Sequence, residues 1–423
     1  MTMPIVGFAG MTHLGIVTGV CAAEKGFKVI CFDPEVKRIN ELNQNKLPVS
    51  EPLLEKLVIK NKLKIQFTSN IERLKSCDVV YVAPDVSTDD EGQSDLLTIS
   101  TLLEAVFDAT ESKTVIVILS QVPPGYSRQK QRSGRALYYQ VETLIFGRAV
   151  ERAIYPERYI IGCADANKPI TGKWKIYLDS YNCPLLTMRY ESAELAKISI
   201  NMCLVSAVTT ANTLAEICEK IGANWSEIVE ALKLDKRIGP FSYLNPGLGI
   251  AGGNLERDLA TVCNFANKYG TDDGVVRAWI ANSEYRRNWP IRILHEKVFN
   301  KTHDPNITIW GLSYKENTNS IKNSPSINLI KSISEYQIRF YDPVVPYKII
   351  ESKNIVGAKT EIEACEKSDV LIIITPWEQF RKINPSLIAK NMRGKLVIDP
   401  YNVLSKKECI NAGLEYITLG QSY

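Results

Sequence analysis

Two glycine-rich loops place polar side chains beside backbone that can approach a ligand closely. One is the turn GMTHLG at residues 10–15, and the other is the segment PGLGIAGGNLERDL at residues 246–259. Glycine permits such an approach because it has no side chain. The second loop ends in Asn254 and Asp258 and has no nucleophile between its glycines and its charged residues. It therefore offers an amide and a carboxylate rather than a thiol or a hydroxyl.

The turn at residues 10–15 has the dinucleotide-binding pattern G-x-G-x-x-G, with Thr12 in place of the second glycine. In that pattern Gly10 makes the tight turn, the middle position lets the backbone approach a pyrophosphate, and Gly15 allows helix packing. Asp33 can accept hydrogen bonds from an adenosine ribose and repel a 2′-phosphate, which favours NAD over NADP. Lys37 could reach the same ribose. An ordinary turn that binds no ligand is the alternative.

The elements around this turn form a βαβ unit. PIVGFAG indicates a buried strand, GIVTGVCAAEKG a helix closed by Gly26, and KVICFD a strand that ends at Asp33. Further apolar runs occur at CDVVYVAP, KTVIVILSQ and RYIIGCAD, with helical patterns between them. This alternation predicts a doubly wound domain with a parallel sheet at about residues 1–190.

A long helical pattern without proline follows at residues 191–222, and the α/β alternation returns after about residue 300. The pattern is apolar over much of its circumference, so we expect this helix to pack against a second copy or against the flanking domains. The predicted fold class is α/β, with two doubly wound Rossmann-like domains joined by a long central helix and a helical middle domain. The expected domains are 1–190, 191–300 and 301–423.

Composition excludes several other classes of protein. The 423 residues are 45% hydrophobic and 23% charged, with a formal charge of +4 and no dense basic block, which does not favour nucleic acid as a partner. The ten cysteines form no CxxC and no Cys/His cluster, so we expect no metal site and a reducing compartment. The first nine residues do not resemble a signal peptide, and no apolar run suits a membrane span. A cytoplasmic protein without a membrane partner is expected.

Nine segments in the same order along the chain resemble the UDP-glucose/GDP-mannose dehydrogenase family. They are THLGIVTGVCAAEKGFKV, NKLPVSEP, DDEGQSDL, SQVPPG, ESAELAKISIN, DKRIGPFSYLNPGLGIAGG, WGLSYKENTNSIKNSP, YDP and TPWEQF. Members of this family oxidise C6 of a nucleotide sugar with NAD. The resemblance implies a homodimer built on the central helix, NAD on the N-terminal domain and a UDP-sugar on the C-terminal domain.

The resemblance assigns catalytic roles to five positions. Lys197 and Asn201, four residues apart on one helix face, match residues that hold a water and the sugar oxygen and stabilise an alkoxide. Asp258 matches an aspartate that orders the same water, and Glu142 matches the acid of the family's PEF motif. The family's nucleophilic cysteine, four residues before the aspartate, is replaced by Asn254.

Further positions match the family's ligand-binding residues. The loop that wraps the UDP-sugar is matched by Tyr243, Asn245, Gly247 and Gly249. Lys315 matches a lysine that reaches the sugar and phosphate, and Arg237 matches an arginine that crosses from the partner subunit. Lys322 stands at the arginine of the family's DIRxSP and is expected near the cofactor. Tyr401 replaces the arginine of DGRN.

The loss of the cysteine restricts the chemistry that we expect. The family's second oxidation passes through a thiohemiacetal and a thioester, and an asparagine amide forms neither. Cys263 and Cys203 are not expected to substitute. Three hypotheses follow: an NAD-dependent enzyme limited to one two-electron oxidation of a nucleotide sugar, an epimerase-like enzyme that retains NAD and returns the hydride, and a non-catalytic nucleotide-sugar-binding homologue.

Overall fold

The computed structural model describes residues 2–87, 89, 94–350 and 352–422, and the chain divides into two compact units. Unit 1 is Met1–Ile200 and unit 2 is Asn201–Tyr423, so the division falls within the long helix α8 (Tyr190–Ile221). The DDEGQSDL segment at residues 89–96 lies partly outside the described residues. The expected three domains remain a prediction.

An eight-stranded sheet forms the core of unit 1, in the order β3-β2-β1-β4-β5-β6-β7-β8. Its strands are β1 (Ile5–Ala9), β2 (Lys28–Phe32), β3 (Ile65–Thr68), β4 (Val79–Val82), β5 (Val115–Ile118), β6 (Leu137–Gln140), β7 (Tyr159–Cys163) and β8 (Leu185–Arg189). The predicted doubly wound order is confirmed for the first six strands. The pairing of β6 with β7 is antiparallel, and the other strand pairs of the sheet are parallel as expected.

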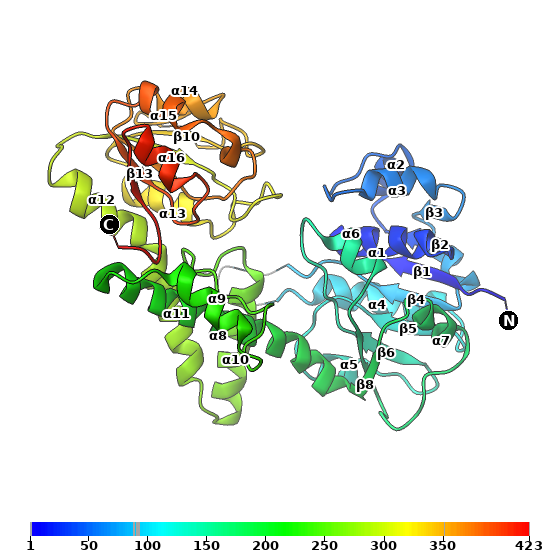
Figure 1. The fold of residues 1–423 in the computed structure, drawn as a ribbon. Helices are drawn as coiled ribbons and strands as arrows, with labels where there is room; N and C mark the ends of the chain where they lie inside the picture. Colours follow the sequence, from blue (N-terminus) through cyan, green and yellow to red (C-terminus); the bar gives the residue numbers. More distant parts are fainter. Residues whose placement is uncertain (1, 88, 90–93, 351, 423) are drawn as a thin grey trace. The chain divides into compact units, whose positions relative to one another are not determined.

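Helices cover both faces of this sheet (Figure 1). They are α1 (His13–Glu24), α2 (Val36–Asn43), α3 (Leu54–Lys60), the 3-10 turn η1 (Ile71–Ser76), α4 (Leu97–Ala109), α5 (Tyr126–Gln129), α6 (Ala149–Ile154) and α7 (Gly172–Asp179). One apolar core joins the sheet to α1, α6 and α7, and a second joins it to α4. The strands β1 and β4 are buried on both faces, as their continuous apolar sequences predict.

Unit 2 contains a wholly parallel six-stranded sheet in the order β11-β10-β9-β12-β13-β14. Its strands are β9 (Asn306–Trp310), β10 (Gln337–Tyr341), β11 (Ile355–Gly357), β12 (Val370–Ile373), β13 (Leu396–Ile398) and β14 (Glu415–Ile417). Around it lie α12 (Trp289–Leu294), the π turn η2 (His295–Phe299), α13 (Pro325–Ser332), α14 (Glu361–Cys365), η3 (Phe380–Lys382), α15 (Pro385–Asn391) and α16 (Lys406–Asn411). This sheet repeats the order of the first six strands of unit 1.

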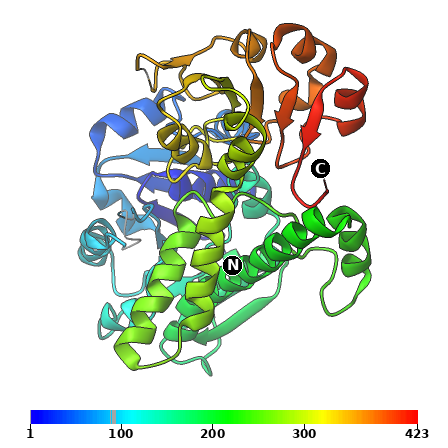
Figure 2. The same ribbon diagram turned by 90° about the vertical axis from the view of Figure 1, so that its left-hand side faces the viewer.

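The helical part of unit 2 precedes its sheet and consists of the C-terminal part of α8 with α9 (Trp225–Leu234), α10 (Asn254–Tyr269) and α11 (Gly274–Arg287). The helices α10 and α11 run side by side (Figure 2). By length and composition α8 could cross a membrane, which corrects our expectation that no segment suits a span, and 33% of its most apolar stretch is buried inside the protein. Core helices of soluble proteins meet the same criterion.

Candidate active site

The glycine turn at residues 10–15 joins β1 to α1 and is tightly packed. Gly10 has a φ of +98°, and a Cβ there would lie 2.7 Å from backbone of the loop after β4. A Cβ on Gly15 would lie 1.9 Å from the Gly10 carbonyl oxygen. Both positions therefore require glycine. Thr12 precedes α1, and its Oγ1 accepts a hydrogen bond of 2.7 Å from the Asp85 backbone N–H.

Asp33 lies at the end of β2 with only 2% of its surface exposed. Its Oδ2 accepts hydrogen bonds from the Met11 N–H at 2.6 Å and from Arg38 Nη1 at 2.9 Å. Its Oδ1 accepts from the Glu35 N–H at 2.9 Å. These three donors leave acceptor capacity for a ribose hydroxyl. Lys37 is exposed, and within the described ranges the guanidinium of Arg38, which the sequence did not single out, is the cation on Asp33.

His13 connects the glycine turn to the segment that carries Glu142. Its buried ring places Nε2 2.9 Å from Glu51 Oε1, and it packs on Phe146 with ring centroids 4.2 Å apart. Glu51 also accepts backbone hydrogen bonds from Gly147 at 3.0 Å and Ala149 at 3.2 Å. The sequence analysis did not predict this contact. The available signal was a histidine inside a nucleotide-binding turn.

Lys197 and Glu142, two of the predicted catalytic residues, form an ion pair in unit 1. Lys197 Nζ lies 3.2 Å from Glu142 Oε2, with side-chain exposures of 13% and 18%. The Leu144 N–H donates to the other oxygen of the same carboxylate. This half-buried pair combines a cation that can stabilise a developing oxyanion with a carboxylate that can exchange a proton.

One helical turn before Lys197, the side chain of Glu194 anchors the SQVPPG loop to α8. Its fully buried carboxylate accepts the backbone N–H of Gly125 at 2.6 Å and of Ser127 at 2.8 Å. Burial raises the pKa of Glu194 above the ordinary glutamate value. The motif that contributed to the family resemblance is therefore held to the helix that carries Lys197.

Asn201 and Asp258, two further predicted catalytic residues, are hydrogen-bonded in unit 2. The Asn201 amide Nδ2 donates to Asp258 Oδ2, and Arg257 Nε donates to Oδ1 at 3.2 Å. Asp258 is 1% exposed, so its charge depends on such donors. Asn201 follows Lys197 by four residues on α8, which puts both side chains on one face of that helix.

Asn254 is the first residue of α10 and its side chain is exposed. It follows Gly253, which has a φ of +102° and precedes the first helical turn, where backbone N–H groups lack partners within the helix. Cys263 lies nine residues further on the same helix, about 13 Å along its axis. Burial raises the pKa of the Cys263 thiol, which lowers its thiolate fraction. Position 254 thus presents an amide where the resemblance expects a thiolate.

The glycine loop at residues 246–253 is fixed by side chains that accept hydrogen bonds from its backbone. They are Asn212 with Gly247 at 2.7 Å, Tyr401 with Leu248 at 3.4 Å, and Ser283 with Ile250 at 2.7 Å. Gly249 has a φ of +79°, and a Cβ there would lie 2.4 Å from the Ser283 carbonyl oxygen. Burial raises the pKa of Tyr401 to about 12, so its hydroxyl remains protonated at neutral pH.

The segment after β9 packs against the same loop. A Cβ on Gly252 would lie 2.4 Å from the Tyr314 ring, and one on Gly253 would lie 3.4 Å from the Lys322 side chain. Burial raises the pKa of Tyr314. Lys315 has its Nζ 5.7 Å from the Tyr314 ring centroid. Lys322, which we expected near the cofactor, therefore contacts the predicted substrate loop.

Three other predicted substrate residues lie on the surface of unit 2. Arg237 is 88% exposed and pairs with Asp235 at 2.6 Å, an interaction that lowers the pKa of that carboxyl group. Tyr243 is 46% exposed, and Asn245 is exposed as well. Within the described parts of this chain, Arg237 is bound to its neighbour rather than to the glycine loop.

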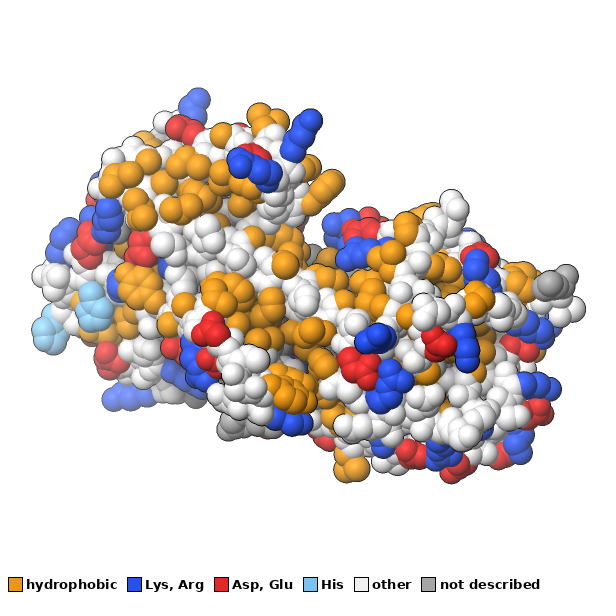
Figure 3. All heavy atoms as spheres, turned by 90° about the horizontal axis from the view of Figure 1, so that it is seen from below, with side chains coloured by type: hydrophobic (Ala, Val, Ile, Leu, Met, Phe, Trp, Pro, Cys, Tyr) orange, Lys and Arg blue, Asp and Glu red, His pale blue; other side chains and the backbone are white. Residues whose placement is uncertain are grey.

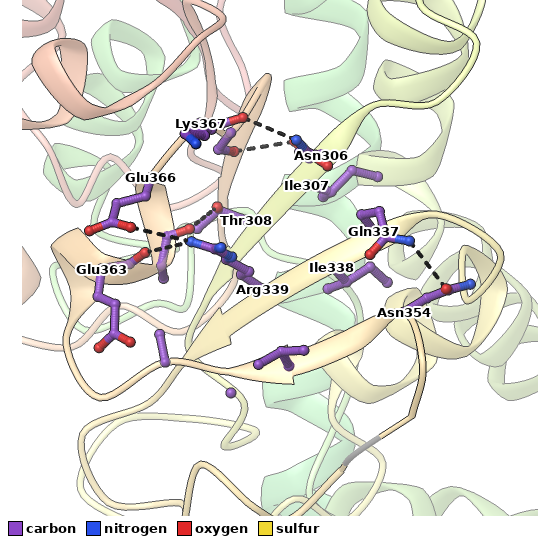
Figure 4. A pocket seen from close by; sticks show the side chains of 15 residues that line it. Asn306, Ile307, Thr308, Gln337, Ile338, Arg339, Asn354, Glu363, Glu366 and Lys367 are labelled. Atoms are coloured by element: carbon purple, nitrogen blue, oxygen red, sulfur yellow. Dashed lines mark hydrogen bonds and ion pairs between the residues drawn. The ribbon is translucent and has the colours of Figure 1, made fainter.

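Two cavities of unit 2 differ in their relation to the sheet. One, of about 370 Å³, is lined by Asn245, Tyr401 and residues that follow the carboxyl ends of β12, β13 and β14. The other, of about 340 Å³, lies at the amino ends of β9 and β10, where Arg339 pairs with Glu366 at 3.7 Å (Figure 4). Ligands of open α/β sheets bind at the carboxyl ends of strands, which favours the first cavity.

Family comparisons agree with this arrangement over most of the chain. The UDP-glucose/GDP-mannose dehydrogenase models match at residues 4–178 for the NAD binding domain, 191–284 for the central domain and 308–406 for the UDP binding domain. The chain belongs to this family. The resemblance inferred from the nine segments is confirmed, and so is NAD as the cofactor.

Curated relatives span the whole chain. A UDP-glucose 6-dehydrogenase of Rickettsia conorii is 26% identical over 430 residues, covering 98% of this chain and 99% of the relative. One of Rhizobium meliloti is 28% identical and covers 97% and 98%. A UDP-glucose dehydrogenase structure from Pyrobaculum islandicum has a TM-score of 0.85 at 23% identity, with 98% and 97% covered, and shows the same fold.

Membership places the chain among NAD-dependent oxidoreductases that act on CH–OH groups. The residues of unit 1 fit NAD: Gly10 and Gly15 allow the tight turn and helix packing of the dinucleotide-binding fingerprint, and Asp33 offers an acceptor to a ribose. One neighbour is unexpected, because Asp85 brings a carboxylate to the N-terminal end of α1.

Proposed function

We propose that this family member catalyses a single two-electron oxidation of a CH–OH group of a nucleotide sugar, with UDP as the expected nucleotide. The product is then an aldehyde or a ketone rather than an acid. The observation that carries the proposal is Asn254 at the start of α10, four residues before the buried Asp258. An amide there supports binding but cannot form the sulfur-linked adduct that a second oxidation requires.

The residues of the two pairs supply the chemistry of one oxidation. NAD held by the glycine turn and Asp33 would supply the hydride acceptor for the carbinol carbon. We assign to the Lys197 ammonium and the Asn201 amide the stabilisation of the alkoxide that forms as the hydride leaves. The hydroxyl proton is accepted by one carboxylate, for which Glu142 and Asp258 are the two candidates. Each carboxylate already has a donor, Lys197 for the first and Asn201 for the second.

The cavity of about 370 Å³ is our candidate for the nucleotide part of the substrate. Its charged lining residues are Lys233 and Glu230 of α9, which pair at 3.1 Å, and Arg381 of η3. The lining therefore has a net positive charge, which suits a diphosphate. Tyr401, which stands at the family's arginine position, offers a neutral hydroxyl instead of a guanidinium. We therefore propose weaker phosphate binding at that position than an arginine would give.

Product analysis tests the proposed reaction. UDP-sugars deuterated at the reacting carbon are incubated with NAD and the full chain, and carbonyl products are trapped with a hydrazide and identified by mass. The proposal expects a trapped carbonyl and one deuterium in the NADH formed. Recovery of substrate whose deuterium has been returned to an inverted carbon would instead favour the epimerase-like alternative. The Lys197→Met variant is the control and should form the carbonyl more slowly, by about 100-fold or more.

We propose further that the chain forms a homodimer through α8. Leu214, Ile217 and Ile221 lie on one stripe of this helix and are 41%, 47% and 70% exposed. Hydrophobic side chains are also exposed among charged ones on the face of the molecule in Figure 3. Sedimentation of the parent should give a dimer, and Ile217→Glu should shift it toward the monomer. A monomeric parent at micromolar concentration would contradict this proposal.

A further inference from the structure

Asp85 holds the N-terminal end of α1 through both its side chain and its backbone. Its Oδ2 accepts a hydrogen bond of 3.1 Å from the His13 backbone N–H, at the first residue of the helix. Its own N–H donates at 2.7 Å to Thr12 Oγ1. Asp85 follows β4, so the two contacts fix the loop after that strand to the glycine turn.

The first of these contacts uses a backbone donor that a dinucleotide diphosphate could otherwise accept from, the His13 N–H. In Rossmann-type domains the pyrophosphate binds at the glycine turn, where the backbone N–H groups and the helix dipole favour negative charge. A carboxylate on the His13 N–H satisfies one of these donors and places a like charge beside any phosphate that approaches it. A diphosphate that accepts from the His13 N–H must therefore displace the Asp85 carboxylate.

We propose that Asp85 is an internal competitor for the cofactor diphosphate and sets the affinity of the chain for NAD. In the absence of NAD the carboxylate stabilises α1 in place of the phosphate. NAD binding requires the His13–Asp85 hydrogen bond to break and the charge to move away. The Thr12 hydroxyl, at the position of the fingerprint's missing glycine, holds the loop that carries this charge.

Calorimetric binding with two substitutions separates the charge from the hydrogen bond. Asp85→Asn keeps an acceptor for the His13 N–H but removes the charge, and Asp85→Ala removes both. NAD and ADP-ribose carry the diphosphate, and adenosine carries none. Glu72→Gln is the matched control, because Glu72 is an exposed acid of the same unit that pairs with Lys75.

We expect Asp85→Ala to bind NAD and ADP-ribose about tenfold more tightly than the parent, with a smaller gain for Asp85→Asn. Adenosine affinity should be unchanged in both variants, and Glu72→Gln should behave like the parent. Thermal unfolding without ligand establishes that each variant is folded. NAD affinity that is equal or weaker in both folded variants overturns the proposal, as does an equal gain for adenosine. Because calorimetry measures binding and not turnover, failure of this proposal can be distinguished from failure of the proposed oxidation.

Discussion

Replacement of Asn201 by leucine should destabilise unit 2, because Asn201 donates to the buried Asp258 carboxylate. Asp258 is 1% exposed, and its charge is compensated by the Asn201 amide on Oδ2 and by Arg257 Nε at 3.2 Å on Oδ1. Leucine is similar in size to asparagine but has no donor. Hydrogen bonds to charged groups contribute about 1.5–3 kcal/mol, and we expect the free energy of unfolding to fall by about that amount.

Urea unfolding followed by tryptophan fluorescence measures this loss. Of the six tryptophans, only Trp174 lies in unit 1, so the signal reports mainly on unit 2. With a slope of about 3 kcal/mol per molar urea, the midpoint should fall by about 0.5–1 M. The slope should be unchanged.

The Asn201→Asp variant is the matched control for charge. It places a second carboxylate against Asp258, so one of the two carboxyl groups should have a raised pKa. A raised folded-state pKa means that the stability is present at low pH and is lost as the pH rises through that pKa. We expect this variant to be less stable than Asn201→Leu at pH 8 and to recover toward pH 5. Equal midpoints for the parent and both variants would refute the role assigned to Asn201.

Three further predictions concern the cofactor turn, the ion pair and the nearest thiol. Gly15→Ala places a Cβ 1.9 Å from the Gly10 carbonyl oxygen. It should abolish NAD binding measured by calorimetry while nucleotide-sugar binding remains. Retained NAD affinity would contradict the assignment of this turn to NAD. Lys197→Met should slow sugar oxidation by 100-fold or more, which corresponds to about 3 kcal/mol of transition-state stabilisation. Glu142→Gln should reduce the rate by a smaller factor. Rates equal to that of the parent would show that this ion pair takes no part in the mechanism. Because the pKa of Cys263 is raised, its alkylation, followed by peptide mass, should be slow at pH 7 and accelerate only at higher pH; fast labelling at pH 7 would show a usable thiolate.

Much of the fold could be predicted because buried parallel strands have continuous apolar sequences. The strands β1 and β4 are such runs, and the sequence indicated both. The edge strands β3 and β8 were missed because they are only partly buried and carry polar side chains. The antiparallel pairing of β6 and β7 depends on how the chain returns between them, which strand composition does not encode.

The residues of the candidate site also include some that the sequence predicted and one that it missed. Spacing on one helix placed Lys197 and Asn201 on a common face, and family resemblance supplied Glu142 and Asp258 as their companions. Asp85 was missed because its partner His13 is 72 residues away in sequence and the contact exists only after β1 and β4 pair. An acid in a loop has no sequence signature that distinguishes such a role from solvation.

The ratio of NADH formed to nucleotide sugar consumed tests the role of Asn254 most directly. The purified chain is incubated with a limiting amount of UDP-sugar and excess NAD, NADH is followed by absorbance, and the sugar product is identified by mass. A single oxidation predicts one NADH per sugar and no sugar acid. Two NADH per sugar with a uronate as the product would contradict the account.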